Sequence, residues 1–212
     1  VVVHLDHGLT YDTCIKALKL GFSSVMYDCS TDSYEENVRK VKEMADIAHS
    51  YGATIEGELG HVGDNEGSAE GSSHLADPSA FFTDPALAKD FVDRTGVDAL
   101  AIAVGNAHGA YKLPPKLDFE RIRTIAKTVD VPLVLHGGTG IEPEDFIRCH
   151  QNGIKKINIA TATFAAAEGK AREGYENGEI KGYYDLHTKE IEGAYENAKK
   201  HMEIFYSVGK AE

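Results

Sequence analysis

Six short apolar runs rich in β-branched residues alternate with segments of helical periodicity, and this alternation constrains the fold more than any other feature. Strands are predicted at residues 1–6, 23–28, 54–60, 99–105, 131–137 and 155–161. The predicted helices at 10–21, 33–52 and 84–96 each end at a glycine, the usual residue after a helix. Repeated strand–helix units imply a parallel sheet with right-handed crossovers.

Polar residues stand at the carboxyl end of each predicted strand. They are Asp6, His7, Asp28, Glu58, His108, His136 and Asn158. An open sheet gathers its ligands at one switch point, whereas a barrel brings the carboxyl ends of all its strands around one mouth. This distribution predicts an α/β protein with a (β/α)₈ TIM barrel fold.

The predicted barrel is shorter than a complete one. Six βα units fall within residues 1–163, and the chain starts inside a strand, so we expect two further units to precede it. Residues 164–212 are predicted to be helical, and we expect residues 1–212 to form a single domain. The last helix is either an oligomer contact or a packing element of the barrel. Expressed alone, the 212 residues should expose strand edges and associate.

Charge and hydropathy exclude several classes of function. Acidic residues outnumber basic ones by 34 to 22, which argues against a nucleic-acid surface. The sequence contains no apolar run of about 18 residues and no signal peptide pattern, so we expect no membrane span and a cytoplasmic location. A small phosphorylated ligand remains compatible, because backbone amides and a metal can hold it locally.

Three histidines at strand ends predict a metal site. His7, His108 and His136 are each followed directly by a glycine, and three imidazoles with one open position suit a catalytic Zn²⁺. Asp28 and Glu58 could orient a ligand histidine, hold a second metal position or cap loops.

Asp6 adjoins the predicted ligand His7, but strand alternation should turn its side chain away unless the strand end twists. An uncoordinated carboxylate beside a metal suits proton transfer, and holding a histidine is the alternative role.

Two loops complete the predicted site. The HGGTG segment at 136–140 follows a strand and precedes a helix, an arrangement in which glycine amides and a threonine hydroxyl bind phosphate. The long segment 61–85 is rich in glycine and serine, like a functional lid. It carries Glu66 and Glu70, and a mobile carboxylate there could act as a general base.

Several motifs together resemble one enzyme family. HLDHG, SSVMYDCS, IEGELG, TDPALAKDFVDRTGVDALAIAVGNAHGAYK, LVLHGGTGI and KINIAT occur in the order typical of class II, metal-dependent ketose-bisphosphate aldolases. The resemblance covers residues 1 to about 163 and implies a barrel enzyme, a homodimer or homotetramer. Such enzymes split fructose or tagatose 1,6-bisphosphate into dihydroxyacetone phosphate and glyceraldehyde 3-phosphate.

The resemblance also implies roles for individual residues. His7, His108 and His136 would hold the catalytic zinc, with Asp28 and Glu58 at a second metal position. Asp6 would exchange the proton of the C4 hydroxyl, and Glu66 would move the C1 proton, although GDNEG departs from the family's GGEEDG-like run and Glu70 is close by. The residues implied in binding dihydroxyacetone phosphate are Gly109, Gly137, Gly138, Thr139, Asn158, Ile159, Ala160 and Thr161.

Some assignments stay open at this level. Ala160 favours the tagatose branch, but one residue does not settle the configuration at C4, and the need for a monovalent cation is undetermined. The alternatives are another zinc-dependent phosphosugar barrel enzyme, an epimerase or a hydrolase, and a non-catalytic phosphosugar-binding subunit. A binding subunit would be expected to lose metal ligands or Asp6, and this sequence retains them.

Overall fold

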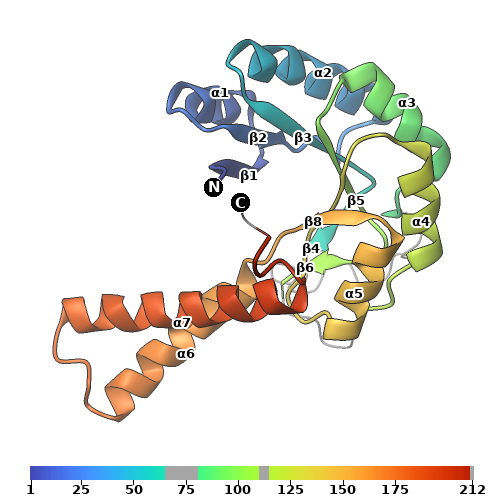
Figure 1. The fold of residues 1–212 in the computed structure, drawn as a ribbon. Coiled ribbons are helices and arrows are strands. Elements are labelled where there is room, and N and C mark those ends of the chain that lie inside the picture. The colour runs from blue at the N-terminus through green and yellow to red at the C-terminus, as the bar shows by residue number, and fades with distance from the viewer. Residues whose placement is uncertain (65–80, 110–114, 211–212) are drawn as a thin grey trace.

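Six parallel strands form the central sheet of the computed structural model, which describes residues 1–64, 81–109 and 115–210. In sheet order they are β1 (His4–Gly8), β2 (Ser24–Tyr27), β3 (Thr54–Leu59), β5 (Ala99–Ile102), β7 (Leu133–Leu135) and β8 (Ile154–Ile157). Each strand falls on or overlaps its predicted run, and the sheet curves into a half barrel (Figure 1). The parallel α/β prediction is confirmed; closure into a full eight-stranded barrel stays a prediction.

Helices cover the convex face of this sheet (Figure 1). They are α1 (Tyr11–Lys19), α2 (Tyr34–Ser50), α3 (Pro85–Thr95), α4 (Phe119–Thr128) and α5 (Pro143–Asn152). The α3 boundaries show why these segments are helical: the Asp84 carboxylate accepts from the amide of Ala86, and Gly96 ends the helix at φ 71°.

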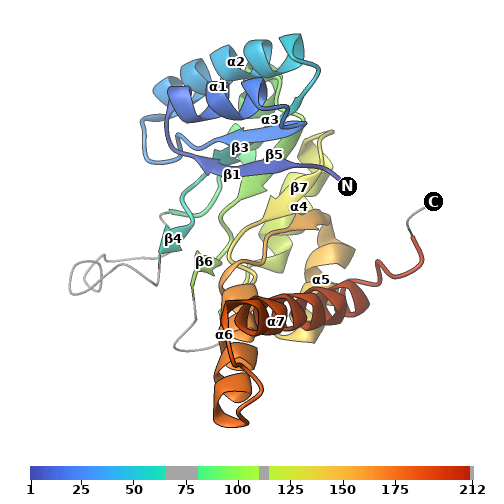
Figure 2. The same ribbon diagram turned by 90° about the vertical axis from the view of Figure 1, so that its left-hand side faces the viewer.

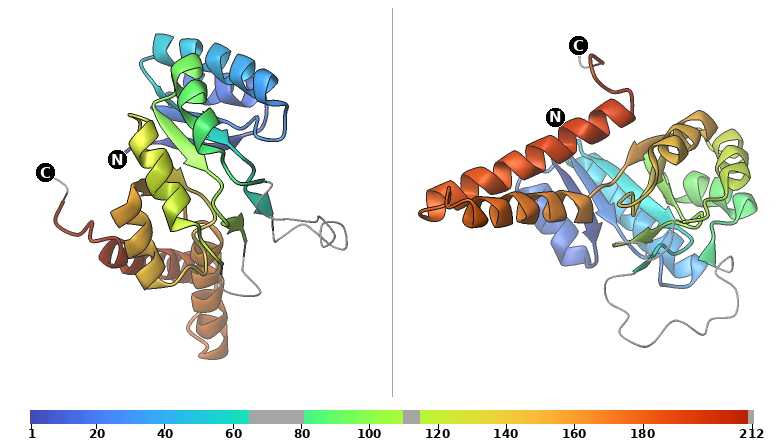
Figure 3. Two further views of the ribbon diagram at one scale, coloured as in Figure 1. Left: turned by 90° about the vertical axis from the view of Figure 1, so that its right-hand side faces the viewer. Right: turned by 90° about the horizontal axis from the view of Figure 1, so that it is seen from below.

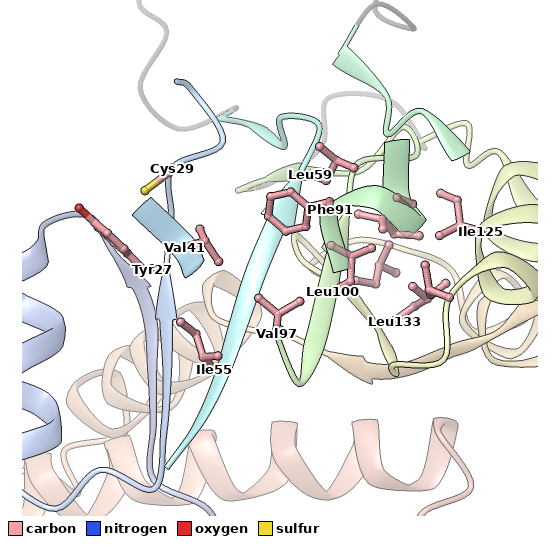
Figure 4. Close-up of a cluster of buried hydrophobic side chains, with 14 of the residues drawn as sticks. Tyr27, Cys29, Val41, Ile55, Leu59, Phe91, Val97, Leu100, Ile125 and Leu133 are labelled. Atoms are coloured by element: carbon pink, nitrogen blue, oxygen red, sulfur yellow. The ribbon is translucent and has the colours of Figure 1, made fainter. Parts of the chain in front are cut away.

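The hydrophobic core lies between the sheet and these helices (Figure 4). Ile55 and Leu59 of β3 point into it, toward the fully buried Phe91 of α3. Burying side chains of this size contributes about 1.5–3 kcal/mol each. Because successive strand residues face opposite sides, Glu56 and Glu58 of the same strand point into the concave interior.

Two short strands form a separate two-stranded sheet near the carboxyl ends of the main strands. β4 (Gly63–Asp64) and β6 (Ala107–His108) pair in parallel, with Asp64 opposite His108 (Figure 2). This pairing fixes the backbone of His108 beyond the end of β5, so that the residue lies near the carboxyl ends of the main strands.

Two long helices, α6 (Thr161–Glu176) and α7 (Tyr183–Ile204), form a hairpin that projects from the half barrel (Figure 3). The helices touch closely at Gly193, where an added Cβ would lie 2.3 Å from the carbonyl oxygen of Ala166. Within the described ranges, no helix has both the length and the apolar character needed to span a bilayer.

Substituting Gly193 by alanine should separate the hairpin helices. The new methyl group overlaps the Ala166 carbonyl, so we expect the free energy of unfolding to fall by about 1–3 kcal/mol in urea titrations. Gly169→Ala on α6 is the matched control, because its Cβ would meet nothing within 4 Å. That control should gain up to about 1 kcal/mol from helix propensity alone. Equal effects at the two sites would contradict the close packing.

Candidate metal centre

Three histidine rings converge at the carboxyl end of the sheet. His7 Nε2 lies 2.7 Å from His136 Nδ1 and 3.1 Å from His108 Nε2. One nitrogen from each ring lies within 4.8 Å of the others. His7 comes from β1, His108 from β6 and His136 from the loop after β7, so residues distant in the sequence meet at one point as the strand-end analysis predicts.

These nitrogens suit a tetrahedral zinc ion. Ligand nitrogens bound at 2.0–2.1 Å around Zn²⁺ lie about 3.3 Å apart, and the two spacings from His7 Nε2, 2.7 and 3.1 Å, are close to that value. The outer nitrogen of His7, Nδ1, donates to Asp28 Oδ2 at 2.7 Å, and such carboxylate partners commonly orient metal-bound imidazoles. The donor set and its support therefore fit the metal.

Asp6 lies beside the histidine cluster, contrary to the expectation from strand alternation. Its Oδ1 is 3.8 Å from both His7 Nε2 and His136 Nδ1. The reason is a break in the pleat: His7 has φ 49°, and the pairing of β1 with β2 shifts register between Leu5 and Gly8. The side-chain amide of Asn158 donates to Asp6 Oδ1 at 2.9 Å. This hydrogen bond fixes the Asp6 carboxylate although its side chain is 45% exposed.

Asp28 and Glu58 form a second candidate ligand group with His7, again with atoms within 4.8 Å of one another. Burial opposes ionisation of Asp28, but the hydrogen bonds from His7 and Ser30 outweigh it and hold the pKa of this carboxyl well below its usual range. Burial, reinforced by the charge of Asp28, raises the pKa of Glu58 to about 7.

One buried oxygen of Glu58 lacks a hydrogen-bond partner among the described residues, which suggests a cation site. Glu58 Oε1 accepts from the amide of Val62 at 3.1 Å. Glu58 Oε2 is buried and makes no hydrogen bond within the part of the chain that the structure describes. A buried carboxylate oxygen without such a bond costs free energy, and a metal ion would supply the missing partner.

The raised pKa of Glu58 predicts a pH-dependent stability in the presence of chelator. The folded state holds the proton up to about pH 7, whereas the unfolded carboxyl releases it near 4.5, so the stabilisation is complete below 4.5 and is lost as pH rises toward 7. The loss is on the order of 3 kcal/mol. Glu58→Gln lacks this proton, so urea titrations from pH 4 to 8 should show the variant gaining on the parent as pH rises. A pH-independent difference would contradict the burial argument.

The loops after β7 and β8 lie against each other. The Gly138 amide donates to the Asn158 carbonyl at 3.1 Å, and Thr139 Oγ1 accepts from the Ala162 amide at 3.0 Å in the first turn of α6. Gly137 has φ 66°, and a Cβ there would lie 2.1 Å from the carbonyl oxygen of Ala107. Only glycine therefore fits where this loop crosses the backbone leading to His108.

The remaining predicted substrate contacts surround the same loops. Gly109 is buried with φ 86° directly after His108, Ile159 packs against Gly138, and Ala160 and Thr161 begin α6. Their binding roles stay predictions. Glu66, predicted as the loop base, and Glu70 lie outside the described residues.

Sequence reasoning missed two residues of the interior. Glu56 and Lys156 form an ion pair with Nζ 2.8 Å from Oε2, directly behind His136. Lys156 is the third residue of the four-residue β8, and its ammonium contacts Glu56 in the concave interior. The available signal was the spacing of Glu56 and Glu58, which puts both carboxylates on one face of an otherwise apolar strand.

Fold and site together define a class of α/β protein with a candidate metal centre at the carboxyl ends of its parallel strands. A model of the class-II fructose-bisphosphate aldolase family matches residues 1–210. A Bacillus subtilis protein described as a probable fructose-bisphosphate aldolase is 41% identical over 175 residues, which are 82% of this chain and 59% of that protein.

Two solved structures extend the likeness. The crystal structure of the YdjI aldolase from Escherichia coli superposes with a TM-score of 0.85 at 36% identity, covering 100% of this chain and 72% of that one. A putative fructose-1,6-bisphosphate aldolase from Coccidioides immitis gives a TM-score of 0.86 at 31% identity, covering 99% and 72%. The chain belongs to the class-II fructose-bisphosphate aldolase family. It spans 59% of the length of its Bacillus subtilis relative.

Proposed function

We propose that this protein catalyses zinc-dependent aldol cleavage and condensation of a ketose 1,6-bisphosphate. The products of cleavage are dihydroxyacetone phosphate and glyceraldehyde 3-phosphate. The observation that carries the proposal is the convergence of His7, His108 and His136 within 4.8 Å, with the Asp6 carboxylate 3.8 Å from two of the rings. Membership of the family supports the same reaction.

The chain's own residues would divide the work as follows. When bound by the three histidines, with Asp28 and Glu58 as an alternative position, zinc supplies a Lewis acid that polarises the ketose oxygens. Asp6 takes the proton of the C4 hydroxyl, which allows the C3–C4 bond to break and the aldehyde to leave. The side-chain amide of Asn158 fixes the Asp6 carboxylate through a hydrogen bond of 2.9 Å. Glu66 is the proposed acid that then donates a proton to the dihydroxyacetone phosphate fragment, at the carbon that becomes its C1.

Phosphate binding is assigned to the two contacting loops. Gly137, Gly138 and Thr139 lie beside the N-terminus of α6, where Ala160 and Thr161 begin the helix. Helix N-termini and glycine-rich turns present amides to anions, so this corner suits the dihydroxyacetone phosphate end of the substrate. The overall charge of −12 does not oppose this, because the recognition is local.

A coupled assay tests the proposal. Purified protein should release dihydroxyacetone phosphate from fructose or tagatose 1,6-bisphosphate, lose the activity with chelator and regain it with Zn²⁺. Comparing the two sugars identifies the preferred C4 configuration, and adding K⁺ or Na⁺ shows whether a monovalent cation assists. Activity that survives chelation would refute the metal mechanism. Epimerised or dephosphorylated product would identify the alternative enzyme classes, and binding without turnover would identify a binding subunit.

The hairpin is proposed as the contact of a homodimer or homotetramer. It projects from the half barrel (Figure 3). It also exposes several large apolar or aromatic side chains. They are Phe164, Tyr175, Tyr183, Tyr184, Ile191 and Tyr195. Sedimentation equilibrium should give a dimer or tetramer, and a monomer would refute this assignment. A cytoplasmic location stays a prediction.

A further inference from the structure

A hydrogen-bonded chain of polar side chains crosses the concave interior behind the histidine cluster. Glu56 accepts from His136 through Oε1 at 2.7 Å and from Lys156 through Oε2 at 2.8 Å. Lys156 Nζ also lies 3.4 Å from His4 Nε2, and His4 Nδ1 lies 2.8 Å from Ser24 Oγ. This chain of contacts joins the loop after β7 to β3, β8, β1 and β2, and so connects the two edge strands of the sheet, β1 and β8.

The contacts of His136 determine which of its nitrogens carries the proton. Its ring is fully buried, with Nδ1 directed at His7 and Nε2 at the Glu56 carboxylate. A carboxylate only accepts, so Nε2 must be the donor in this contact. The side-chain amide of Asn158 lies 3.3 Å from the same nitrogen, which is farther than the 2.7 Å to Glu56. This amide already donates a hydrogen bond to Asp6 at 2.9 Å.

We propose that Glu56, oriented by Lys156, is a positioning residue that holds His136 in the Nε2–H tautomer and so presents the bare Nδ1 to the metal. This inference rests on the proposed metal site and adds what prepares one of its ligands. Neither residue touches the metal position: Glu56 acts through His136, and Lys156 acts through Glu56. Outer partners of this kind are worth about 10- to 100-fold in metal affinity.

A glutamine at position 56 distinguishes positioning from simple packing. The substitution Glu56→Gln keeps the shape but leaves one acceptor oxygen between two donors. Lys156 can only donate, so its ammonium should take that oxygen and leave the amide NH₂ facing His136 Nε2. His136 would then have to accept at Nε2 and carry its proton on Nδ1, where the proton blocks metal binding.

Removing Lys156 should therefore rescue the glutamine variant. In Glu56→Gln/Lys156→Met the amide is free to rotate and turn its oxygen to His136, which restores the Nε2–H tautomer. Glu56→Gln/Lys155→Met is the matched control, because Lys155 is exposed on the same strand. If Glu56 only filled space, adding Lys156→Met would lower the zinc affinity of the Glu56→Gln variant further instead of restoring it.

The test combines zinc competition titration with long-range ¹H–¹⁵N spectra of the histidine rings. We expect Nε2–H for His136 in the unsubstituted protein, zinc binding weaker by about 10- to 100-fold in Glu56→Gln, and recovery of most of that loss only with Lys156→Met. If the unsubstituted protein binds no zinc, the proposed function fails.

Three results would overturn the positioning role while leaving zinc binding intact. The first is a His136 ring that carries no proton on Nε2 in chelator-treated unsubstituted protein, a measurement that needs no variant to fold. The second is zinc affinity of Glu56→Gln within threefold of the parent. The third is equal rescue by the Lys155 control.

Discussion

Asp6→Ala is expected to retain zinc and to lower kcat by about 10²- to 10⁴-fold, the range for general acid–base groups. The carboxylate lies 3.8 Å from two of the converging nitrogens, which places it beside the proposed metal position where a proton-transferring group would meet the substrate. Steady-state kinetics and zinc content are to be measured on the same preparation. Asp12→Ala, in the first turn of α1, is the control and should leave both unchanged. Zinc lost together with activity would make Asp6 a structural support of the histidines.

His108→Ala should remove the metal itself. Losing one of three protein ligands should cost more than the roughly 10- to 100-fold in affinity that an outer partner contributes, so dialysed protein should hold little zinc and show no turnover. The control is His49→Ala, because His49 on α2 pairs with Asp98 away from the cluster. The readouts are zinc stoichiometry and the coupled assay. A variant that keeps a full equivalent of zinc would contradict the assignment of His108.

Hydrophobic periodicity and helix-end residues were sufficient to predict the six parallel strands and the helices between them. The strand-end histidines could be predicted to meet because carboxyl ends of parallel strands lie at one edge. These features depend on local sequence and on topology, and both can be read along the chain. Closure of the barrel depends on strand pairing other than that of the six described strands, and it stays a prediction.

Details of the site depended on three-dimensional packing. The position of Asp6 follows from the positive φ of His7, and the sequence HLDHG does not reveal which residue breaks the pleat. The Glu56–Lys156 ion pair joins residues 100 positions apart, and its existence depends on how far the sheet curves. The role of Glu66 as the loop base stays a prediction, since this residue lies outside the described ones.

The central claim is that three imidazoles hold one divalent cation beside an uncoordinated carboxylate. X-ray absorption at the zinc edge of the purified, zinc-loaded protein tests it most directly. We predict three nitrogen ligands at about 2.0–2.1 Å with the outer-shell scattering of imidazole rings. An oxygen ligand from water or substrate should complete the coordination shell. Sulfur at about 2.3 Å, or a shell of oxygen without imidazole scattering, would contradict the claim.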